Sequence, residues 1–190
     1  MNNGTKNAVG IFVVTFAVTL VVNRFMMQMN ADSSTTATPK GVPWVDPKHP
    51  CGPTCVAIVG RLNKRPIALA DAVAATRPDS LGRTSMAELV VACEQFGLHA
   101  AAVEVRAGQM HKLRIPAIAH TNYEHFLVLV PNRSGNLMVL DPPRQPSQPD
   151  PVALQTMCSG KLILVGATES ELDGALTAFG LTRRSKTRGG

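Results

Sequence analysis

The sequence is poor in aromatic residues, which make up only 4% of its 190 residues. A hydrophobic core therefore has to be built from valine, leucine, isoleucine, alanine and methionine. The overall hydrophobic content of 45% is ordinary for a globular protein. The length is sufficient for one folded domain with extensions at its ends.

Cysteines are also few, and their spacing fits neither a disulfide scaffold nor a zinc site. Four cysteines in a chain of this length do not form a disulfide framework. Only Cys51 and Cys55 lie close together, and no second pair completes the ligand set of tetrahedral zinc. We therefore expect neither a metal nor another cofactor. Cys55 and Cys93 each fall on the apolar face of a predicted helix, where we expect them to be buried.

The sequence lacks the concentration of basic residues that a nucleic-acid-binding face requires. Its net charge is +6, but the last eight residues alone contribute four of these charges. The remainder is close to balanced, so a nucleic acid is not an expected partner. Residues 182–190 are expected to form a basic, solvated and disordered tail. A Gly-x4-Gly-Lys-Ser/Thr loop for nucleotide phosphates is also absent from the sequence.

One long apolar run is present, and it lies near the N-terminus. Residues 8–22 contain neither a charge nor an amide, and residues 25–29 continue the run beyond Arg24. Residues 8–22 alone are short for a membrane span, but Arg24 can extend the span by placing its charge at the bilayer surface. We interpret residues 1–29 as a single-pass membrane anchor; a cleaved signal peptide, which would leave a secreted protein, is the alternative. Basic residues flank the run on both sides, so the membrane side stays open.

The remainder divides into a linker and one domain. Residues 30–43 are rich in serine and threonine and have no periodic apolar pattern, so we expect a flexible linker. In the domain, residues 44–181, apolar periodicity predicts helices first and strands afterwards, which is an α+β arrangement with a mostly antiparallel sheet. The first helix is expected to start just after Cys51, with Pro53 at its first position and an apolar run from Cys55 to Leu62. Further helices are expected over 66–76 and over 85–97, with a helical turn at 109–113 and a closing helix from 168 to 179. The strands are expected at 98–105, 116–120, 125–130, 137–140 and 161–165.

Cys51 stands where the first predicted helix begins. Gly52 permits a tight turn, and Pro53 suits the first helical position because its missing N–H is not needed there. The N-terminus of a helix offers unpaired backbone N–H groups and the positive end of the dipole, and both favour a thiolate over a thiol. Cys51 is therefore a candidate nucleophile. A small buried hydrophobic residue is the alternative.

A histidine and an aspartate are predicted to meet at one edge of the sheet. His125 begins one predicted strand, and Asp141 ends the next one along the chain. If the turn at residues 132–135 makes these strands antiparallel neighbours, Asp141 can orient His125, and His125 can take the proton of Cys51. The alternatives are a structural histidine and an aspartate that merely begins a turn before Pro142.

Four motifs stand in order along the chain. They are Cys51-Gly followed by an apolar helix, Pro116-Ala-Ile-Ala-His120, His125-Phe-Leu-Val-Leu129 and Leu140-Asp-Pro142. Together they resemble the motifs of the double-glycine leader peptidase family, papain-like cysteine peptidases that often form the N-terminal domain of bacteriocin exporters. The resemblance covers about residues 45–166, and segment 158–164 also resembles the closing part of that domain.

The resemblance implies a papain-like fold and a cysteine peptidase that cleaves a peptide or protein after paired small residues, Gly-Gly above all. Together with the apolar run near the N-terminus, it predicts a membrane-tethered peptidase. It makes Cys51 the nucleophile, His125 the base and Asp141 the orienting acid. The spacing of these residues does not separate a peptidase from an amidase or a transferase, which would use the same three groups.

The sequence departs from the family at one position. The family usually places a glutamine about six residues before its nucleophile, where the amide stabilises the oxyanion, but that position is Val45 here. The backbone N–H of Cys51 can supply one oxyanion donor, and Lys48 or His49 a second. A reorganised oxyanion hole, a slow enzyme and an inactive relative that only binds peptides are the three outcomes this substitution leaves open.

Overall fold

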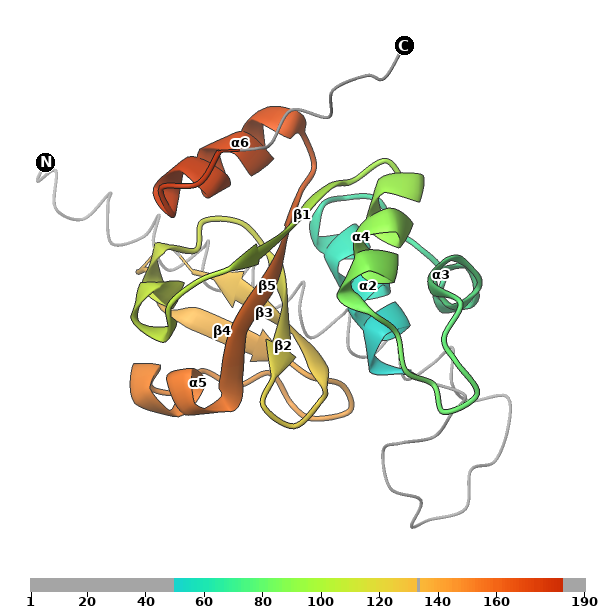
Figure 1. Ribbon diagram of the computed structural model, residues 1–190, viewed down its shortest axis with the longest axis horizontal. Coiled ribbons are helices and arrows are strands. Elements are labelled where there is room, and N and C mark those ends of the chain that lie inside the picture. Colours follow the sequence, from blue (N-terminus) through green and yellow to red (C-terminus); the bar gives the residue numbers. More distant parts are fainter. Residues whose placement is uncertain (1–49, 133, 183–190) are drawn as a thin grey trace, which may run out of the picture. The chain divides into compact units, whose positions relative to one another are not determined.

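The computed structural model describes residues 50–132 and 134–182. These residues form a five-stranded sheet, with every strand antiparallel to its neighbours, in the order β1-β5-β2-β3-β4 (Figure 1). The α+β expectation is therefore confirmed. The strands are β1 (His99–Glu104), β2 (Ala117–Thr121), β3 (Phe126–Pro131), β4 (Leu137–Leu140) and β5 (Cys158–Gly166), and the helices are α2 (Cys51–Leu62), α3 (Leu69–Thr76), α4 (Met86–Gln95), the 3-10 helix η1 (Ala107–Lys112), α5 (Pro151–Met157) and α6 (Glu169–Ala178).

Helices α2, α3 and α4 pack together beside the sheet, as Figure 1 shows. The limits of α4 are those that its sequence predicts. The Ser85 hydroxyl accepts a hydrogen bond from the backbone N–H of Glu88 at 3.2 Å, and the Glu88 carboxylate accepts one from the Ser85 N–H at 2.7 Å. Gly97 has a φ of +72°, which ends the helix in a conformation that glycine adopts freely.

Several boundaries differ from the sequence expectation. Helix α2 has Pro50 as its N-cap and begins at Cys51, so Pro53 is the third helical residue and not the first. Helix α3 begins at Leu69, three residues later than predicted, because Ala68 is extended. Strand β5 begins already at Cys158, three residues earlier than predicted, and lies between β1 and β2.

Helix α5 was not predicted, although its sequence carries two start signals. The Asp150 carboxylate accepts hydrogen bonds from the N–H groups of Val152 and Ala153, each at 2.9 Å, and Pro151 occupies the first helical position. The apolar periodicity is weak because Leu154 alone is buried in this short helix.

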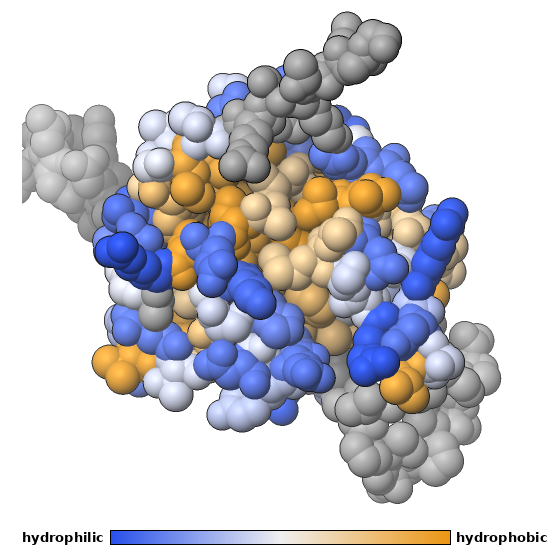
Figure 2. All heavy atoms as spheres, viewed as in Figure 1, coloured by the Kyte–Doolittle hydropathy of each residue, from blue (hydrophilic) through white to orange (hydrophobic). Residues whose placement is uncertain are grey.

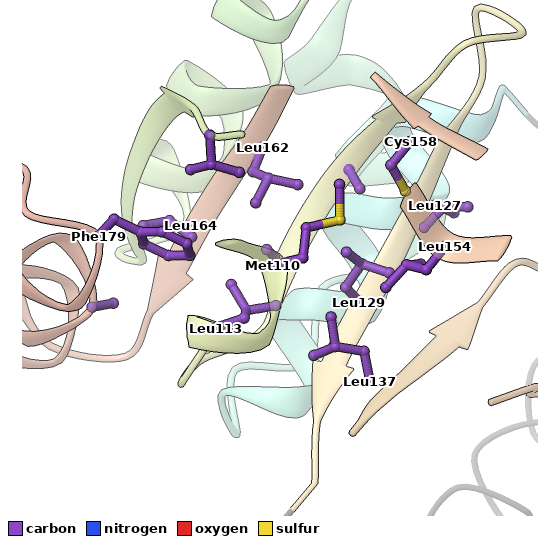
Figure 3. Packing of buried hydrophobic residues seen from close by; sticks show 14 of the residues in the cluster. Met110, Leu113, Leu127, Leu129, Leu137, Leu154, Cys158, Leu162, Leu164 and Phe179 are labelled. Atoms are coloured by element: carbon purple, nitrogen blue, oxygen red, sulfur yellow. The ribbon is translucent and has the colours of Figure 1, made fainter. Parts of the chain in front are cut away.

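Leucines dominate the core on one face of the sheet (Figure 3), and aromatic residues contribute little to it. Central strands β2 and β5 bury consecutive residues, so both faces of the sheet are covered there. Each buried leucine contributes about 2 kcal/mol by removing its side chain from water. The labelled members in Figure 3 are Met110, Leu113, Leu127, Leu129, Leu137, Leu154, Cys158, Leu162, Leu164 and Phe179.

The surface in Figure 2 is mostly hydrophilic, with an apolar area across the middle of the face shown. A shallow groove between β1 and α6 is lined by Ala101, Val103, Leu176 and Leu181. Among the helices that the structure describes, none is long and apolar enough to cross a membrane.

Four of the sequence expectations lie outside the described residues. They are the anchor at 1–29, the linker at 30–43, the start of the domain at 44–49 and all but the first residue of the tail at 182–190. They stay predictions.

Two glycines in the interior of helices, Gly60 in α2 and Gly174 in α6, provide a matched test of the packing around α2. A methyl group at Gly60 would lie 2.7 Å from the Arg65 carbonyl oxygen and 2.5 Å from Cδ1 of Ile67, whereas at Gly174 it would meet nothing within 4 Å. We expect Gly60→Ala to lower the free energy of unfolding by about 2 kcal/mol through overpacking. Gly174→Ala should raise it by roughly 0.5–1 kcal/mol, because alanine favours the helix. Urea denaturation measures both, and equal effects of the two substitutions would contradict this packing.

Candidate active site

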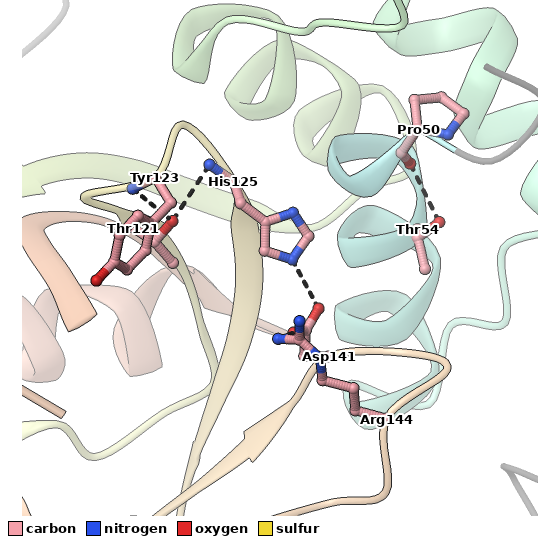
Figure 4. A network of polar contacts seen from close by, with 7 residues as sticks. All are labelled: Pro50, Thr54, Thr121, Tyr123, His125, Asp141 and Arg144. Carbon is pink, nitrogen blue, oxygen red and sulfur yellow. Dashed lines mark hydrogen bonds and ion pairs between the residues drawn. The ribbon is translucent and has the colours of Figure 1, made fainter. Parts of the chain in front are cut away.

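Cys51 is the first residue of α2, and its half-buried side chain lines a cleft. No side chain caps this helix; Thr54 instead donates from its backbone N–H and its hydroxyl to the Pro50 carbonyl (Figure 4). Gly52 permits close packing, because a Cβ there would lie 3.0 Å from Cδ2 of Leu89 in α4. The helix start is thus held in place by backbone contacts and packing, while its thiol faces the cleft.

His125 is placed by the loop between β2 and β3. The Thr121 hydroxyl accepts hydrogen bonds from the backbone N–H groups of Tyr123 and His125, at 3.3 and 3.2 Å. The Thr121 N–H donates to the His125 carbonyl at 2.8 Å. Glu124 takes the left-handed conformation that the loop requires, with a φ of 54°. Figure 4 shows the resulting orientation, with the His125 ring directed from the start of β3 towards α2.

Asp141 directly follows β4 and meets His125 at the same edge of the sheet. The antiparallel register pairs Val128 of β3 with Leu140 of β4, which brings the start of β3 beside the end of β4. Nε2 of His125 donates to Oδ1 of Asp141 at 2.7 Å. Asp141 is only 7% exposed, so this hydrogen bond is well shielded from water. The predicted meeting of the two residues is confirmed.

Interaction between Cys51 and His125 shifts the pKa of both groups. Burial acts to raise the pKa of Cys51, but hydrogen bonds with the His125 ring and the Phe126 backbone, and the charge of His125, outweigh it and lower this pKa. The hydrogen bonds with Asp141 and then Cys51 raise the pKa of His125 to about 9. The site therefore favours a thiolate beside an imidazolium.

The other cysteines have the opposite environment. Burial raises the pKa of Cys55 well above its usual value, that of Cys93 to about 12 and that of Cys158 to about 11. Cys55 lies one helical turn from Cys51, yet it is 2% exposed and belongs to the core. The expected burial of Cys55 and Cys93 is confirmed, and among the four thiols only Cys51 combines access with a lowered pKa.

A cleft of about 850 Å³ contains the three residues. One wall is the segment between α3 and α4, and the other comes from the β2–β3 loop and the residues that follow β4. Leu81 on the first wall is 61% exposed, and Tyr123 on the second is 78% exposed. Both walls of the cleft therefore present a large apolar side chain to the solvent.

Sequence reasoning found Cys51, His125 and Asp141 but missed two residues around them. Thr121 lies between two predicted strands and belongs to no motif, although a threonine before a loop is a common turn-forming residue. Arg144, whose Nη1 donates to Oδ2 of Asp141 at 2.8 Å, carried no motif. The oxyanion candidates Lys48 and His49 lie outside the described residues. Within the described ranges, no group of three or more histidine, cysteine or acidic residues could hold a metal ion.

The α+β fold, with helices packed beside an antiparallel sheet, matches the papain-like fold of peptidase C39 domains. Residues 46–170 match the family description "Peptidase C39 family", and the chain belongs to this family. The suspected kinship with double-glycine leader peptidases is thereby confirmed. No curated protein matches the chain.

Three solved structures share the fold. A double-glycine motif protease from an AMS/PCAT transporter, in complex with the leader peptide, is 18% identical with a TM-score of 0.58, covering 70% of this chain and 91% of that one. The peptidase domain of Streptococcus ComA, a bifunctional ABC transporter involved in a quorum-sensing pathway, is 18% identical with a TM-score of 0.57, covering 67% and 97%. The N-terminal peptidase C39-like domain of a toxin secretion ATP-binding protein from Vibrio parahaemolyticus is 20% identical with a TM-score of 0.52, covering 63% and 97%.

The pH dependence of thiol alkylation tests the electrostatics of the site. Because the pKa of Cys51 is lowered, its thiolate should persist at pH values where an ordinary thiol is protonated. We expect iodoacetamide to modify Cys51 alone in the folded protein. The pH at which its alkylation rate is half-maximal should lie below the corresponding midpoint pH of the urea-unfolded chain. Asp141→Asn should move the midpoint upwards, because it removes the charge that favours the imidazolium. Modification of several cysteines in the folded protein, or a midpoint equal to that of the unfolded chain, would refute the assignment.

Proposed function

We propose that the chain is a cysteine endopeptidase in which Cys51, His125 and Asp141 act together. The observation that carries this proposal is the hydrogen-bonded arrangement at one sheet edge, with His125 between the sulfur of Cys51 and the carboxylate of Asp141. Membership of the peptidase C39 family supports it independently of the geometry.

The reaction follows from the charges of the resting pair. The Cys51 thiolate attacks the carbonyl carbon of the scissile peptide bond, and a tetrahedral oxyanion forms. The His125 imidazolium then gives its proton to the leaving amine as the C–N bond breaks, which leaves a thioester on Cys51. Neutral His125 next takes a proton from water, the hydroxide attacks the thioester, and the acid product leaves. Asp141 orients the imidazole in both steps.

The oxyanion needs hydrogen-bond donors that the family's missing glutamine does not provide here. The backbone N–H of Cys51, at the N-terminus of α2, is the first donor in this proposal. Lys48 or His49 is proposed as the second, because both precede Cys51 closely in the sequence. One missing donor typically costs ~100-fold to 1000-fold in rate, so the identity of the replacement decides how fast the enzyme turns over.

The proposed substrate is a peptide or protein with a Gly-Gly leader. One structure with the same fold is described as a double-glycine motif protease in complex with the leader peptide. The cleft of this chain offers exposed apolar side chains, Leu81 and Tyr123, on its two walls. These would contact apolar leader residues on either side of the bound chain.

A catalytically impaired peptide-binding protein is the second candidate function. The substitution of Val45 for the family's glutamine is the observation that favours it. Such a protein would keep the cleft and bind leader peptides without cleaving them. An amidase would form the same thioester from a different amide and hydrolyse it with water, whereas a transferase would pass the acyl group to another acceptor.

Cleavage of a synthetic peptide containing a Gly-Gly leader tests the proposal directly. The wild-type protein should release fragments that end after Gly-Gly, detected by mass spectrometry, and Cys51→Ala should abolish release while changing stability by less than about 1 kcal/mol. Cys55→Ala is the matched control one turn along α2: it should cost about 1 kcal/mol or more of stability and retain cleavage, because Cys55 is buried in the core.

Other outcomes distinguish the candidate functions. Tight binding of the peptide without fragments, together with ordinary thiol reactivity of Cys51, would favour the peptide-binding protein. Products that carry an added amine acceptor would favour a transferase. Cleavage that survives in Cys51→Ala would overturn the assignment of the nucleophile.

The proposed location is a membrane, reached through the apolar run at residues 8–22. The full chain should remain in the membrane pellet after alkaline carbonate extraction, because an apolar span is held by burial in the bilayer. A chain that starts at residue 30 should be released. Recovery of the full chain in the supernatant, or as a shortened secreted form, would contradict the anchor.

A further inference from the structure

The Asp141 carboxylate is shared between two cationic side chains (Figure 4). Its Oδ1 accepts from Nε2 of His125 at 2.7 Å, and its Oδ2 accepts from Nη1 of Arg144 at 2.8 Å. Two bonds to different oxygens fix the rotation of the carboxylate plane, which one bond to His125 would leave free.

Arg144 reaches this position through a local turn. Its backbone N–H donates to the Asp141 carbonyl at 2.9 Å, so the segment that follows β4 folds back on itself. The Arg144 side chain is 80% exposed and lines the cleft. It contributes little to the core, and its conspicuous interaction is the one with Asp141.

The groups facing Asp141 explain why a second cation matters. His125 approaches from β3, Arg144 from the segment after β4, and the buried neutral thiol of Cys55 lies nearby on α2. His125 itself faces Asp141 and Cys51. If the buried carboxylate faced only the imidazolium, its full negative charge would bind the imidazolium proton more strongly. A general acid, however, has to release that proton to the leaving amine.

We propose that Arg144 is a positioning residue, which holds the Asp141 carboxylate in the plane that meets His125. Its guanidinium also balances part of the negative charge of this carboxylate. This role deepens the proposed function, because it concerns the same proton transfer. Arg144 acts through Asp141 and is not assigned any contact with the reacting atoms.

Arg83 offers a matched control on the opposite wall. It is also an exposed arginine that lines the cleft, and it also pairs with an aspartate of its own segment, Asp79, at 2.9 Å. Replacing either arginine by glutamine removes one positive charge from the cleft. Only Arg144→Gln removes the guanidinium that pairs with Oδ2 of Asp141.

The first measurement follows the His125 ring by NMR against pH and needs no substrate. The His125 signal is assigned as the one that disappears in His125→Gln. We expect Arg144→Gln to raise the pKa of His125 from about 9 by roughly half a unit, because Asp141 then acts on the imidazole alone. Arg144→Lys should restore most of the wild-type value, and Arg83→Gln should leave it unchanged. An unchanged pKa in Arg144→Gln, or an equal shift in Arg83→Gln, would overturn the proposal.

The second measurement is peptide cleavage. Arg144→Gln should lower kcat by roughly threefold to tenfold with little change in KM, because the imidazole is oriented less well while the substrate contacts remain. A change confined to KM would overturn the proposal and make Arg144 a substrate contact. If even the wild-type protein cleaves no peptide, the proposed function fails; the NMR shift would then still support Arg144 as the residue that positions Asp141.

Discussion

The hydrogen bond between His125 and Asp141 joins the start of one strand to the end of the next, and the site depends on it. The bond requires the register that pairs Val128 with Leu140, because a slip of one residue would turn the strand faces over and separate the two side chains. The register is in turn fixed by the leucines that these strands bury. The same packing that stabilises the sheet therefore sets the direction of the imidazole, and helix α2 completes the site by presenting Cys51 to the ring.

Local environment, and not residue type, decides which thiol is reactive. Cys51 and Cys55 lie on the same helix one turn apart, yet the first meets His125 and the first-turn backbone while the second is enclosed by the core. A helix start favours a thiolate through its unpaired N–H groups, and a neighbouring imidazolium adds to that effect. The interior offers neither. One thiol in this arrangement is suited to nucleophilic chemistry, and the buried ones act as small apolar side chains.

Much of the fold was predictable because its local signals agree with its packing. The capping box at Ser85 and the left-handed Gly97 delimit α4 in the structure as in the sequence. Helix α5 was missed because a helix of seven residues that buries only Leu154 has almost no apolar period. At the start of α6, the Thr168 hydroxyl accepts a hydrogen bond from the Glu171 N–H, but the Glu171 carboxylate accepts one from the Ala167 N–H, so the pair does not form the reciprocal capping box that its spacing suggests. Such details depend on the exact course of the chain into the helix, which composition does not specify.

The sequence by itself determined the order of helices and strands, the helical position of Cys51 and the candidacy of His125 and Asp141, because apolar periodicity and turn residues act over short distances along the chain. It did not determine the additional residues that hold those side chains in place. Thr121 holds the His125 backbone and Arg144 takes the second oxygen of Asp141, and neither residue belongs to a motif. Only the tertiary structure decided these contacts, because residues three or four apart meet in a turn only where the backbone takes one particular conformation, as at Glu124 with its φ of 54°.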